Sequence, residues 1–184
     1  MSNIRVSRND IEGLLVIEPT IYRDERGYFL ETYHEQKYQE LGLTAHFVQD
    51  NQSMSAYGVL RGLHFQKKFP QGKLVRVISG EVYDVAVDLR PNSRTYGQHF
   101  GVILSAENQK QFYIPPGFAH GFLVLSKTAE FAYKCTDFYH PNDEGGLAFD
   151  DPEVNIQWPV LEGMTLLISE KDQKWGKLSD LPRE

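Results

Sequence analysis

Short apolar segments with a period of two recur along most of the chain. The clearest stretch is Lys73–Leu89, in which two runs rich in β-branched residues are separated by Ser79–Gly80. In the second run the side chains alternate between two faces, with Tyr83, Val85, Val87 and Leu89 on one and Val82, Asp84, Ala86 and Asp88 on the other. This alternation predicts a half-buried strand, and the glycine predicts that the two runs form a hairpin.

Many short strands predict an all-β fold, a sandwich or barrel rather than a parallel α/β sheet. Turn sequences rich in Pro, Gly and Asn separate several of the runs. Helical patterns are weak: Glu35–Leu43 predicts about two turns and Ser105–Gln109 about one. A barrel of this kind holds a ligand among its inward-facing side chains. The other predicted strands are Leu14–Ile17, Gly27–Tyr33, Val59–Phe65, Phe100–Leu104, Gln111–Ile114, Gly121–Leu125 and Phe131–Phe138.

Composition narrows the class of protein. The chain has 184 residues, of which 41% are hydrophobic, and we expect one domain over residues 1–184. A net charge of −6 argues against a nucleic-acid partner, although a few Arg and Lys side chains can still hold a small anion. The single cysteine, Cys135, excludes an internal disulfide framework. With no membrane-length apolar run and no signal-like N-terminus, we expect a cytoplasmic protein without a membrane partner.

Basic side chains interrupt two of the apolar segments. Gly58–Gln66 reads GVLRGLHFQ and carries Arg61 and His64, Lys73 follows, and the segment PPGFAHGF carries His120. Charge on short apolar strands is costly unless it serves a ligand. His64 alone is better explained as a core histidine satisfied by one hydrogen bond. Together, the set suits proton removal beside a carbonyl group of an anionic substrate, with His64 as the base.

The second histidine lies in a pattern seen in metal-binding barrels. Pro115-x-Gly117-x-x-His120 resembles the second signature of the cupin superfamily, whose barrels often hold a metal through several His and one Glu. The first cupin signature needs His-x-His followed by Glu, whereas this chain continues from His64 as Phe-Gln-Lys-Lys. Two histidines without a third imidazole or a carboxylate make a poor transition-metal site. We therefore predict a cupin barrel without a metal, in which His120 forms hydrogen bonds or faces the substrate.

Several polar residues have both a structural and a functional interpretation. Tyr133 either fills space on a strand face or serves as a general acid. Asp172 lies in a charged segment that would ordinarily be solvated surface, and it could instead orient His64. The charged turn at Arg23–Gly27 and the polar turn at Gln49–Asn51 are typical loops that could equally bind a ligand.

Eight segments together resemble the dTDP-4-dehydrorhamnose 3,5-epimerase family. They cover most of the chain in the family's order, so the match is far more specific than one short motif. The segments are Asp24–Glu31, Phe47–Asn51, Gly58–Gln66, Gln71–Arg90, Leu104–Ser126, Tyr133–Tyr139, Asp151–Pro159 and Ser169–Gln173.

The resemblance implies a cupin-type double-stranded β-helix, with a few short peripheral helices, that works as a homodimer without a metal or cofactor. The implied substrate is a dTDP-linked 4-keto-6-deoxy sugar, inverted at C3 and C5. By matching motifs, His64 is the base with Asp172 as its partner, Tyr133 is the acid on the opposite sugar face, and Lys73 stabilises charge on the C4 oxygen. The implied binding residues are Arg61, His120 and Lys171 for the substrate and diphosphate, Gln49, Asp50, Asn51 and Glu144 for the pocket, and Arg26 and Glu31 for the nucleotide, partly across the dimer.

Two departures from the family pattern affect the predicted site. The family often has an arginine and a glycine after the glutamate, where this chain has Gly145-Gly146, and Gln52 stands where a histidine is frequent. Three other functions compete with the double epimerase. They are an enzyme of the same fold that inverts one carbon or moves the keto group, a non-catalytic cupin that binds a sugar nucleotide, and a metal-dependent cupin oxygenase.

Overall fold

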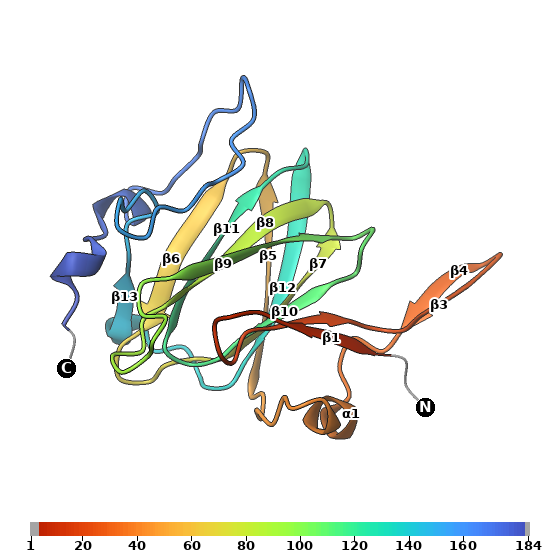
Figure 1. The fold of residues 1–184 in the computed structure, drawn as a ribbon. Coiled ribbons are helices and arrows are strands. Elements are labelled where there is room, and N and C mark those ends of the chain that lie inside the picture. Colours follow the sequence, from red (N-terminus) through yellow and green to blue (C-terminus); the bar gives the residue numbers. More distant parts are fainter. Residues whose placement is uncertain (1–3, 183–184) are drawn as a thin grey trace.

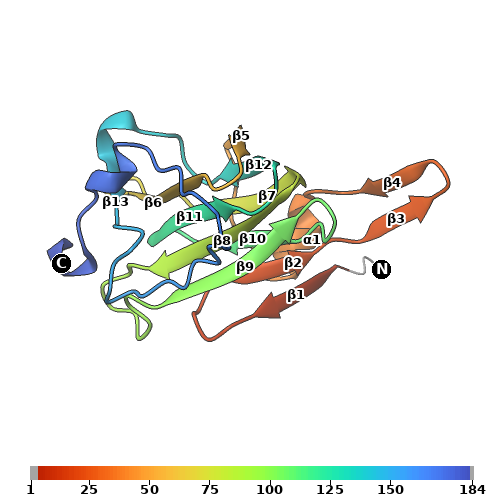
Figure 2. The ribbon, with the colours of Figure 1, turned by 90° about the horizontal axis from the view of Figure 1, so that it is seen from above.

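Two antiparallel sheets form most of the computed structural model, which describes residues 4–182 (Figure 1). The six-stranded sheet has the order β1 (Arg5–Arg8), β2 (Leu15–Glu18), β10 (Gln111–Ile114), β7 (Lys73–Ser79), β12 (Thr128–Cys135) and β5 (Gln49–Ala56). The five-stranded sheet has the order β13 (Glu144–Gly146), β6 (Leu60–Gln66), β11 (Phe118–Val124), β8 (Glu81–Asp88) and β9 (His99–Ser105). Seen from above, the two sheets lie one against the other (Figure 2).

The main hydrophobic core lies between these sheets. Val75, Phe112 and Phe131 come from the six-stranded sheet and pack with Ala86 and Phe122 of the five-stranded sheet. Burying apolar area of this kind contributes ~25 cal/mol per Å² and drives the two faces together. The arrangement confirms the predicted all-β, cupin-like jelly roll.

The predicted hairpin around Ser79–Gly80 is wrong. β7 pairs with β10 and β12, whereas β8 pairs with β11 and β9, so the two strands belong to different sheets. The turn itself is present: Gly80 has φ +82°, and a Cβ there would lie 2.1 Å from the carbonyl oxygen of Thr128. The turn at Gly80 therefore leads the chain from the six-stranded sheet into the five-stranded sheet. In a jelly roll, strands that follow each other in the sequence often pair with other strands rather than with each other.

The predicted half-burial of β8 is also wrong, since residues Asp84 to Asp88 are all buried. The outer face of the five-stranded sheet is covered by the C-terminal part of the chain. Leu147, Val154 and Leu178 of that part pack against Val85 and Val87. The alternation in β8 predicts that one face of the strand is exposed to water. In the structure, an irregular segment with no alternating pattern covers that face.

The remaining elements are short. α1 (Glu35–Glu40) confirms the first predicted helix, and its Tyr38 packs on the outer face of the six-stranded sheet. The second predicted helix, at 105–109, is a turn. Three 3₁₀ helices follow later: η1 (Pro141–Asp143), η2 (Asp172–Lys174) and η3 (Leu178–Asp180). Within residues 4–182, no helix is both long and apolar enough to cross a membrane.

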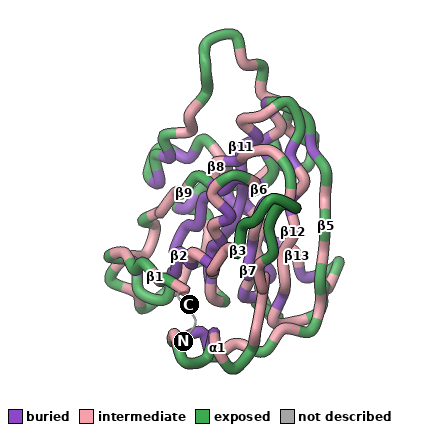
Figure 3. Tube along the Cα trace, turned by 90° about the vertical axis from the view of Figure 1, so that its right-hand side faces the viewer, coloured by how far each residue is buried: buried purple, intermediate pink, exposed green. Residues whose placement is uncertain are grey.

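A two-stranded hairpin, β3 (Ile21–Asp24) and β4 (Gly27–Leu30), projects away from both sheets (Figures 1 and 2). It is drawn almost entirely as exposed in Figure 3. Tyr22, Tyr28 and Phe29 are 60%, 52% and 66% exposed. Tyr22 and Phe29 contact each other, and the Tyr28 hydroxyl accepts a hydrogen bond from Gln109 Nε2 at 3.2 Å.

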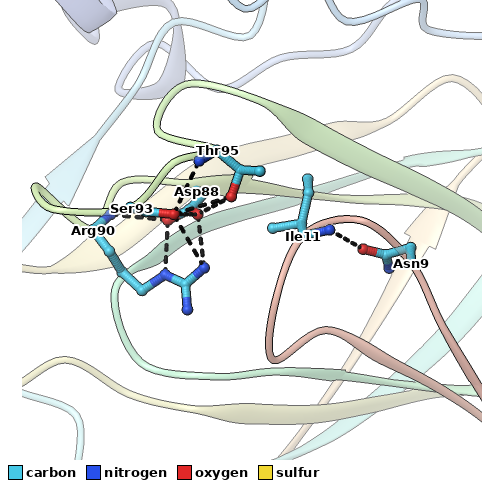
Figure 4. Close-up of polar contacts among 6 residues, drawn as sticks. All are labelled: Asn9, Ile11, Asp88, Arg90, Ser93 and Thr95. Atoms are coloured by element: carbon cyan, nitrogen blue, oxygen red, sulfur yellow. Dashed lines mark hydrogen bonds and ion pairs between the residues drawn. The ribbon is translucent and has the colours of Figure 1, made fainter.

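A polar cluster fixes the loop that follows β8 (Figure 4). The Asp88 carboxylate accepts hydrogen bonds from Arg90 Nε at 2.9 Å, Ser93 Oγ at 2.6 Å and Thr95 Oγ1 at 2.7 Å. Burial opposes ionisation of Asp88, but these donors outweigh it and hold its pKa at about 2. Nearby, Asn9 Oδ1 accepts from the backbone N–H of Ile11 at 2.8 Å. The loop is thereby held against the end of the barrel.

Candidate active site

A cavity of about 680 Å³ lies between the sheets and the loops at one end of the barrel. Five of the predicted site residues line it, and they come from five different strands. Apolar walls are supplied by Phe65, Ile114 and Phe118, and the loop after β8 contributes Arg90. This volume is within the range of small-molecule sites. The predicted residues are His64 on β6, Lys73 on β7, His120 on β11, Tyr133 on β12 and Glu144 on β13.

His64 is paired with Asp172, 108 positions later in the chain. The ring Nε2 lies 2.6 Å from Asp172 Oδ1, and Oδ2 accepts the backbone N–H of Gly62 at 3.3 Å. Burial disfavours the Asp172 carboxylate, but the hydrogen bonds from His64, Gly62 and Trp175 hold its pKa below the usual value. An ionised Asp172 keeps a hydrogen on Nε2, which leaves Nδ1 of His64 as the proton acceptor. Within residues 4–182, Nδ1 makes no hydrogen bond.

A second histidine–aspartate pair lies directly beside the first. His120 is the cross-strand partner of His64, and its Nε2 lies 3.0 and 2.9 Å from the two carboxylate oxygens of Asp84. Burial lowers the pKa of His120 and raises that of Asp84, although each opposes the shift of the other. Asp84 received no functional role from the sequence. The available signal was a carboxylate between apolar residues in the middle of β8.

Lys73 and Tyr133 face the same space. The Lys73 ammonium lies 5.7 Å from the centre of the Tyr133 ring. Burial lowers the pKa of Lys73, while Cys135, Asp84 and Glu144 oppose that shift. Burial raises the pKa of the Tyr133 phenol, so it keeps its proton at neutral pH. Neither the ammonium nor the phenol oxygen has a hydrogen-bond partner in the described part of the chain.

Glu144 and Lys171 form an ion pair at the edge of the cavity. Lys171 Nζ donates to Glu144 Oε2 at 2.6 Å, and the hydroxyl of Tyr139 donates to the same oxygen at 3.4 Å. The backbone N–H of Tyr139 in turn donates to Gln49 Oε1 at 3.0 Å. Tyr139 lines the cavity and is 48% exposed, yet the sequence analysis gave it no role.

The predicted polar turn at Gln49–Asn51 is instead the start of β5, so successive side chains point to opposite faces. Gln49 and Asn51 share one face, where Asn51 donates to Cys135 Sγ at 3.6 Å. The structure does not bring Asp50 to that face: its side chain is 71% exposed and pairs with Lys134. Arg61 lies beyond the cavity edge and donates to Ser55 Oγ at 3.0 Å.

Comparison with known proteins identifies the family. Residues 8–180 match the family described as dTDP-4-dehydrorhamnose 3,5-epimerase. The enzyme of that name from Methanothermobacter thermautotrophicus is 56% identical over 99% of this chain and 98% of the relative. The one from Escherichia coli is 48% identical over 98% and 97%. The crystal structure of dTDP-6-deoxy-D-glucose-3,5-epimerase from Legionella pneumophila in complex with dTDP-4-keto-L-rhamnose matches with a TM-score of 0.94 and 52% identity, covering 98% of this chain and 95% of that one.

The chain belongs to the dTDP-4-dehydrorhamnose 3,5-epimerase family. It is therefore a sugar-nucleotide epimerase, which confirms the predicted family and the predicted isomerase class.

Two binding residues predicted from the epimerase family lie away from the cavity of their own chain. Arg26 is on the projecting hairpin, where its guanidinium binds Asp24, and Glu31 follows β4 and pairs with Lys37. The structure does not bring either residue to His64 within one chain. Their predicted role in nucleotide binding thus depends on a second copy.

The two departures from the epimerase pattern have different locations. A Cβ on Gly145 would lie 2.6 Å from the ring of Phe65, and the side chain of Lys67 is also close. Phe65 therefore occupies the space into which a larger residue 145 would extend. Gln52 lies on the outer face of β5, where it donates to Glu130 at 3.4 Å, and so points away from the cavity.

The donor set around the histidines does not resemble a metal centre. Among residues 4–182, no three His, Cys, Asp or Glu side chains are grouped as ligands for one ion. Each cavity histidine directs Nε2 at a carboxylate instead. That this epimerase works without a metal stays a prediction, which elemental analysis of the purified protein tests.

Proposed function

We propose that this epimerase inverts C3 and C5 of dTDP-4-dehydro-6-deoxy-D-glucose, giving dTDP-4-dehydro-L-rhamnose, with His64 as the base and Tyr133 as the acid. Both carbons flank the C4 ketone, so removal of either hydrogen gives an enolate. Nδ1 of His64 takes the proton, and Asp172 stabilises the imidazolium that results.

Lys73 is the proposed stabiliser of the enolate. A C–H beside a ketone is a weaker acid than imidazolium by roughly 12 pKa units, a deficit of ~16 kcal/mol that a base alone cannot meet. An ammonium directed at the C4 oxygen lowers this deficit, because it acts where negative charge develops. The buried position of Lys73 strengthens the interaction, since few water molecules screen it there.

Tyr133 is the proposed proton donor on the opposite sugar face. When its phenol protonates the enolate carbon, the configuration at that carbon is inverted. The enzyme is then left with an imidazolium and a phenolate, so a proton returns from His64 to Tyr133 through solvent before the next inversion. The raised pKa of Tyr133 supports this role, because its phenolate is readily reprotonated at neutral pH.

One observation carries the proposal. Three groups without a hydrogen-bond partner in the described part of the chain belong to residues that line a single cavity. They are Nδ1 of His64, the phenol of Tyr133 and the ammonium of Lys73. A binding protein would ordinarily pair such partly buried groups with its own side chains. Leaving them unpaired in a low-dielectric cavity is costly, and that cost supports a role in catalysis.

The direct test is incubation with dTDP-4-dehydro-6-deoxy-D-glucose in deuterated water, followed by NMR of the product. We expect deuterium at both C3 and C5 and inverted coupling constants at both centres. Label and inversion at one carbon would support a single-site epimerase of the same fold. An unchanged substrate would contradict the proposal and leave a non-catalytic binder.

We further propose that the chain is a cytoplasmic homodimer in which each hairpin β3–β4 reaches the cavity of its partner. The hairpin projects, exposes three aromatic side chains, and carries Arg26, which its own cavity cannot use. A two-fold dimer contacts both copies through the same surface, so one hairpin would serve each site. The single cysteine, Cys135, is buried and unpaired, which supports a reducing compartment.

Mixing two inactive variants tests this exchange. In a mixed dimer of Arg26→Ala and His64→Asn, one site has both defects and the other has neither. Random reassociation of equal amounts should therefore restore ~25% of the sites, measured as turnover after the mixture is refolded together. Arg26→Ala mixed with itself is the control. A monomeric protein by light scattering, or no recovery in the mixed dimer, would contradict the exchange.

A further inference from the structure

Trp175 stands against the His64–Asp172 pair. Its indole N–H donates to Asp172 Oδ1 at 3.2 Å, and the same oxygen lies 2.6 Å from His64 Nε2. The two rings meet edge to face, with centres 6.3 Å apart and planes at 73°. One carboxylate oxygen is thus shared between the histidine and the tryptophan.

The surrounding backbone is built to admit the indole. Gly146 is the cross-strand partner of His64, and a Cβ on it would lie 2.1 Å from Cδ2 of Trp175. The ring therefore lies against the bare backbone of β13. Next to it, the carbonyl of Gly176 accepts the N–H of Ala148 at 2.8 Å, which fixes the chain beside the ring.

We propose that Trp175 is a positioning residue that sets the orientation and proton affinity of His64 through Asp172 Oδ1. This inference rests on the proposed role of His64 as the base. Together with the N–H of Gly62 on Oδ2, the indole holds the carboxylate in one plane. Because Oδ1 also accepts the indole N–H, it offers less negative charge to an imidazolium at His64 than a carboxylate without this donor would.

Other charged and titratable groups also lie around His64. Lys171 Nζ lies 5.9 Å from the Trp175 ring centre. The charged and titratable groups facing His64 are Asp172 and Lys171 from the C-terminal segment, His120 from β11, Lys73 from β7, Tyr133 from β12 and Glu144 from β13. None of these side chains is altered when the indole alone is replaced.

The first test replaces Trp175 by Phe, which keeps a ring and removes the N–H. With the competing donor gone, Asp172 stabilises the imidazolium more strongly, so the acid limb of kcat/KM should move up by roughly half to one pH unit. Trp158→Phe is the matched control, because Trp158 also loses an indole hydrogen bond, to the carbonyl of Phe149, but lies on the outer covering segment. No shift, or the same shift in both variants, overturns the inference.

The second test leaves Trp175 in place, so it remains valid even if Trp175→Phe does not fold. The chain has two tryptophans, and Trp158→Phe leaves Trp175 as the sole emitter. Since a protonated imidazole quenches a neighbouring indole, its fluorescence should rise with pH along the acid limb of kcat/KM. That titration should vanish in Trp158→Phe/His64→Asn. A flat emission between pH 5 and 8 overturns the contact on which the inference depends.

These results separate failure of the inference from failure of the proposed function. If His64→Asn keeps full turnover, His64 is not the base and the proposed function fails. If His64→Asn is inactive while Trp175→Phe leaves the acid limb unmoved, the proposed function stands and Trp175 has only a packing role.

Discussion

Two histidine–aspartate pairs lie side by side in one barrel, and they differ in access to the cavity. The side chains of His64 and Asp172 are 29% and 5% exposed, whereas those of His120 and Asp84 are 8% and 0% exposed. The two histidines are cross-strand partners on β6 and β11, so they have similar positions in the sheet. What distinguishes them is the origin of the carboxylate: Asp84 comes from the adjacent strand β8, and Asp172 from the distant C-terminal segment.

In the proposed mechanism, this difference separates the pair that moves a proton, His64–Asp172, from a structural pair, His120–Asp84. Burial lowers the pKa of His120 and raises that of Asp84, which favours an uncharged pair that holds the cavity wall. The pKa of Asp172 is lowered instead, so its charge remains available to stabilise an imidazolium at His64. The degree of burial therefore determines which role we assign to each histidine–aspartate pair.

Replacing each histidine by Asn gives the largest expected contrast. His64→Asn should reduce turnover at least ~10³-fold, because it removes the proposed base. His120→Asn should act mainly through KM, with kcat falling no more than ~10-fold. Steady-state kinetics by NMR measure both, and circular dichroism controls for folding. Equal losses of kcat in the two variants would remove the distinction between the pairs.

Tyr133→Phe should uncouple the base from the acid. Solvent deuterium should still enter C3 or C5, because His64 can remove and return a proton on its own face. Net inversion should fall ~10²-fold or more, since the opposite face has lost its donor. The ratio of deuterium incorporation to inversion in NMR spectra is the measurement. If both rates fall equally, the acid role is contradicted.

Deprotonation of Lys73 should cause the loss of turnover at alkaline pH. Its ammonium must be charged to stabilise the enolate, and burial lowers its pKa from 10.5, so activity is lost as pH rises through that lowered value. Tyr133, whose pKa is raised, ionises later. Lys73→Arg should cost ~10-fold in kcat but move the alkaline limb to higher pH, because a guanidinium stays charged. An unmoved limb would assign it to another group.

Asp84→Asn should affect stability more than chemistry. Replacing a buried carboxylate that bonds His120 should cost ~1–3 kcal/mol of unfolding free energy, measured by urea denaturation. Turnover should fall less than in Asp172→Asn, the matched change in the reactive pair. An Asp84→Asn protein that is fully stable yet as inactive as Asp172→Asn would show that the buried pair takes part in the reaction.

Lys171→Ala gives the smallest effect. The ion pair with Glu144 lies at the cavity edge, and the Lys171 side chain is 53% exposed. We expect KM to rise up to ~10-fold with kcat unchanged, as for a residue that holds the diphosphate. Lys174→Ala, at an exposed lysine of the same segment, is the control. A change confined to kcat would contradict a binding role.

Strands with apolar alternation were predictable, including those that carry cavity residues, whereas the polar strand β5 was not. The alternation in β7, β8 and β10 marks their positions correctly, because their side chains enter the core. The first three residues of β5, Gln49–Asn51, predict a polar turn because they lack the apolar alternation of the other strands. Pairing partners were equally hidden, because the Gly80 turn is local whereas the choice of sheet depends on the whole chain.

For the site, motif matching named the residues, but the sequence could not specify their contacts. His64 and Lys73 stand in recognisable segments, whereas the pairing of His120 with Asp84 depends on the register of β11 against β8. Asp50 was grouped with Gln49 and Asn51 by adjacency, and the strand then turned it to the other face. Trp175 gave no signal, because its importance arises from the bare backbone of Gly146 far earlier in the chain.

The late position of Asp172 has a consequence for the protein during synthesis. Both sheets are complete once Gly146 leaves the ribosome, yet the carboxylate that fixes the base is still to come. A nascent or truncated chain can thus have a finished barrel and no competent catalyst. A single proteolytic cut near the exposed Leu161 would have the same effect once the tail departs. In the proposed mechanism, catalytic competence therefore depends on a C-terminal segment that lies outside both sheets.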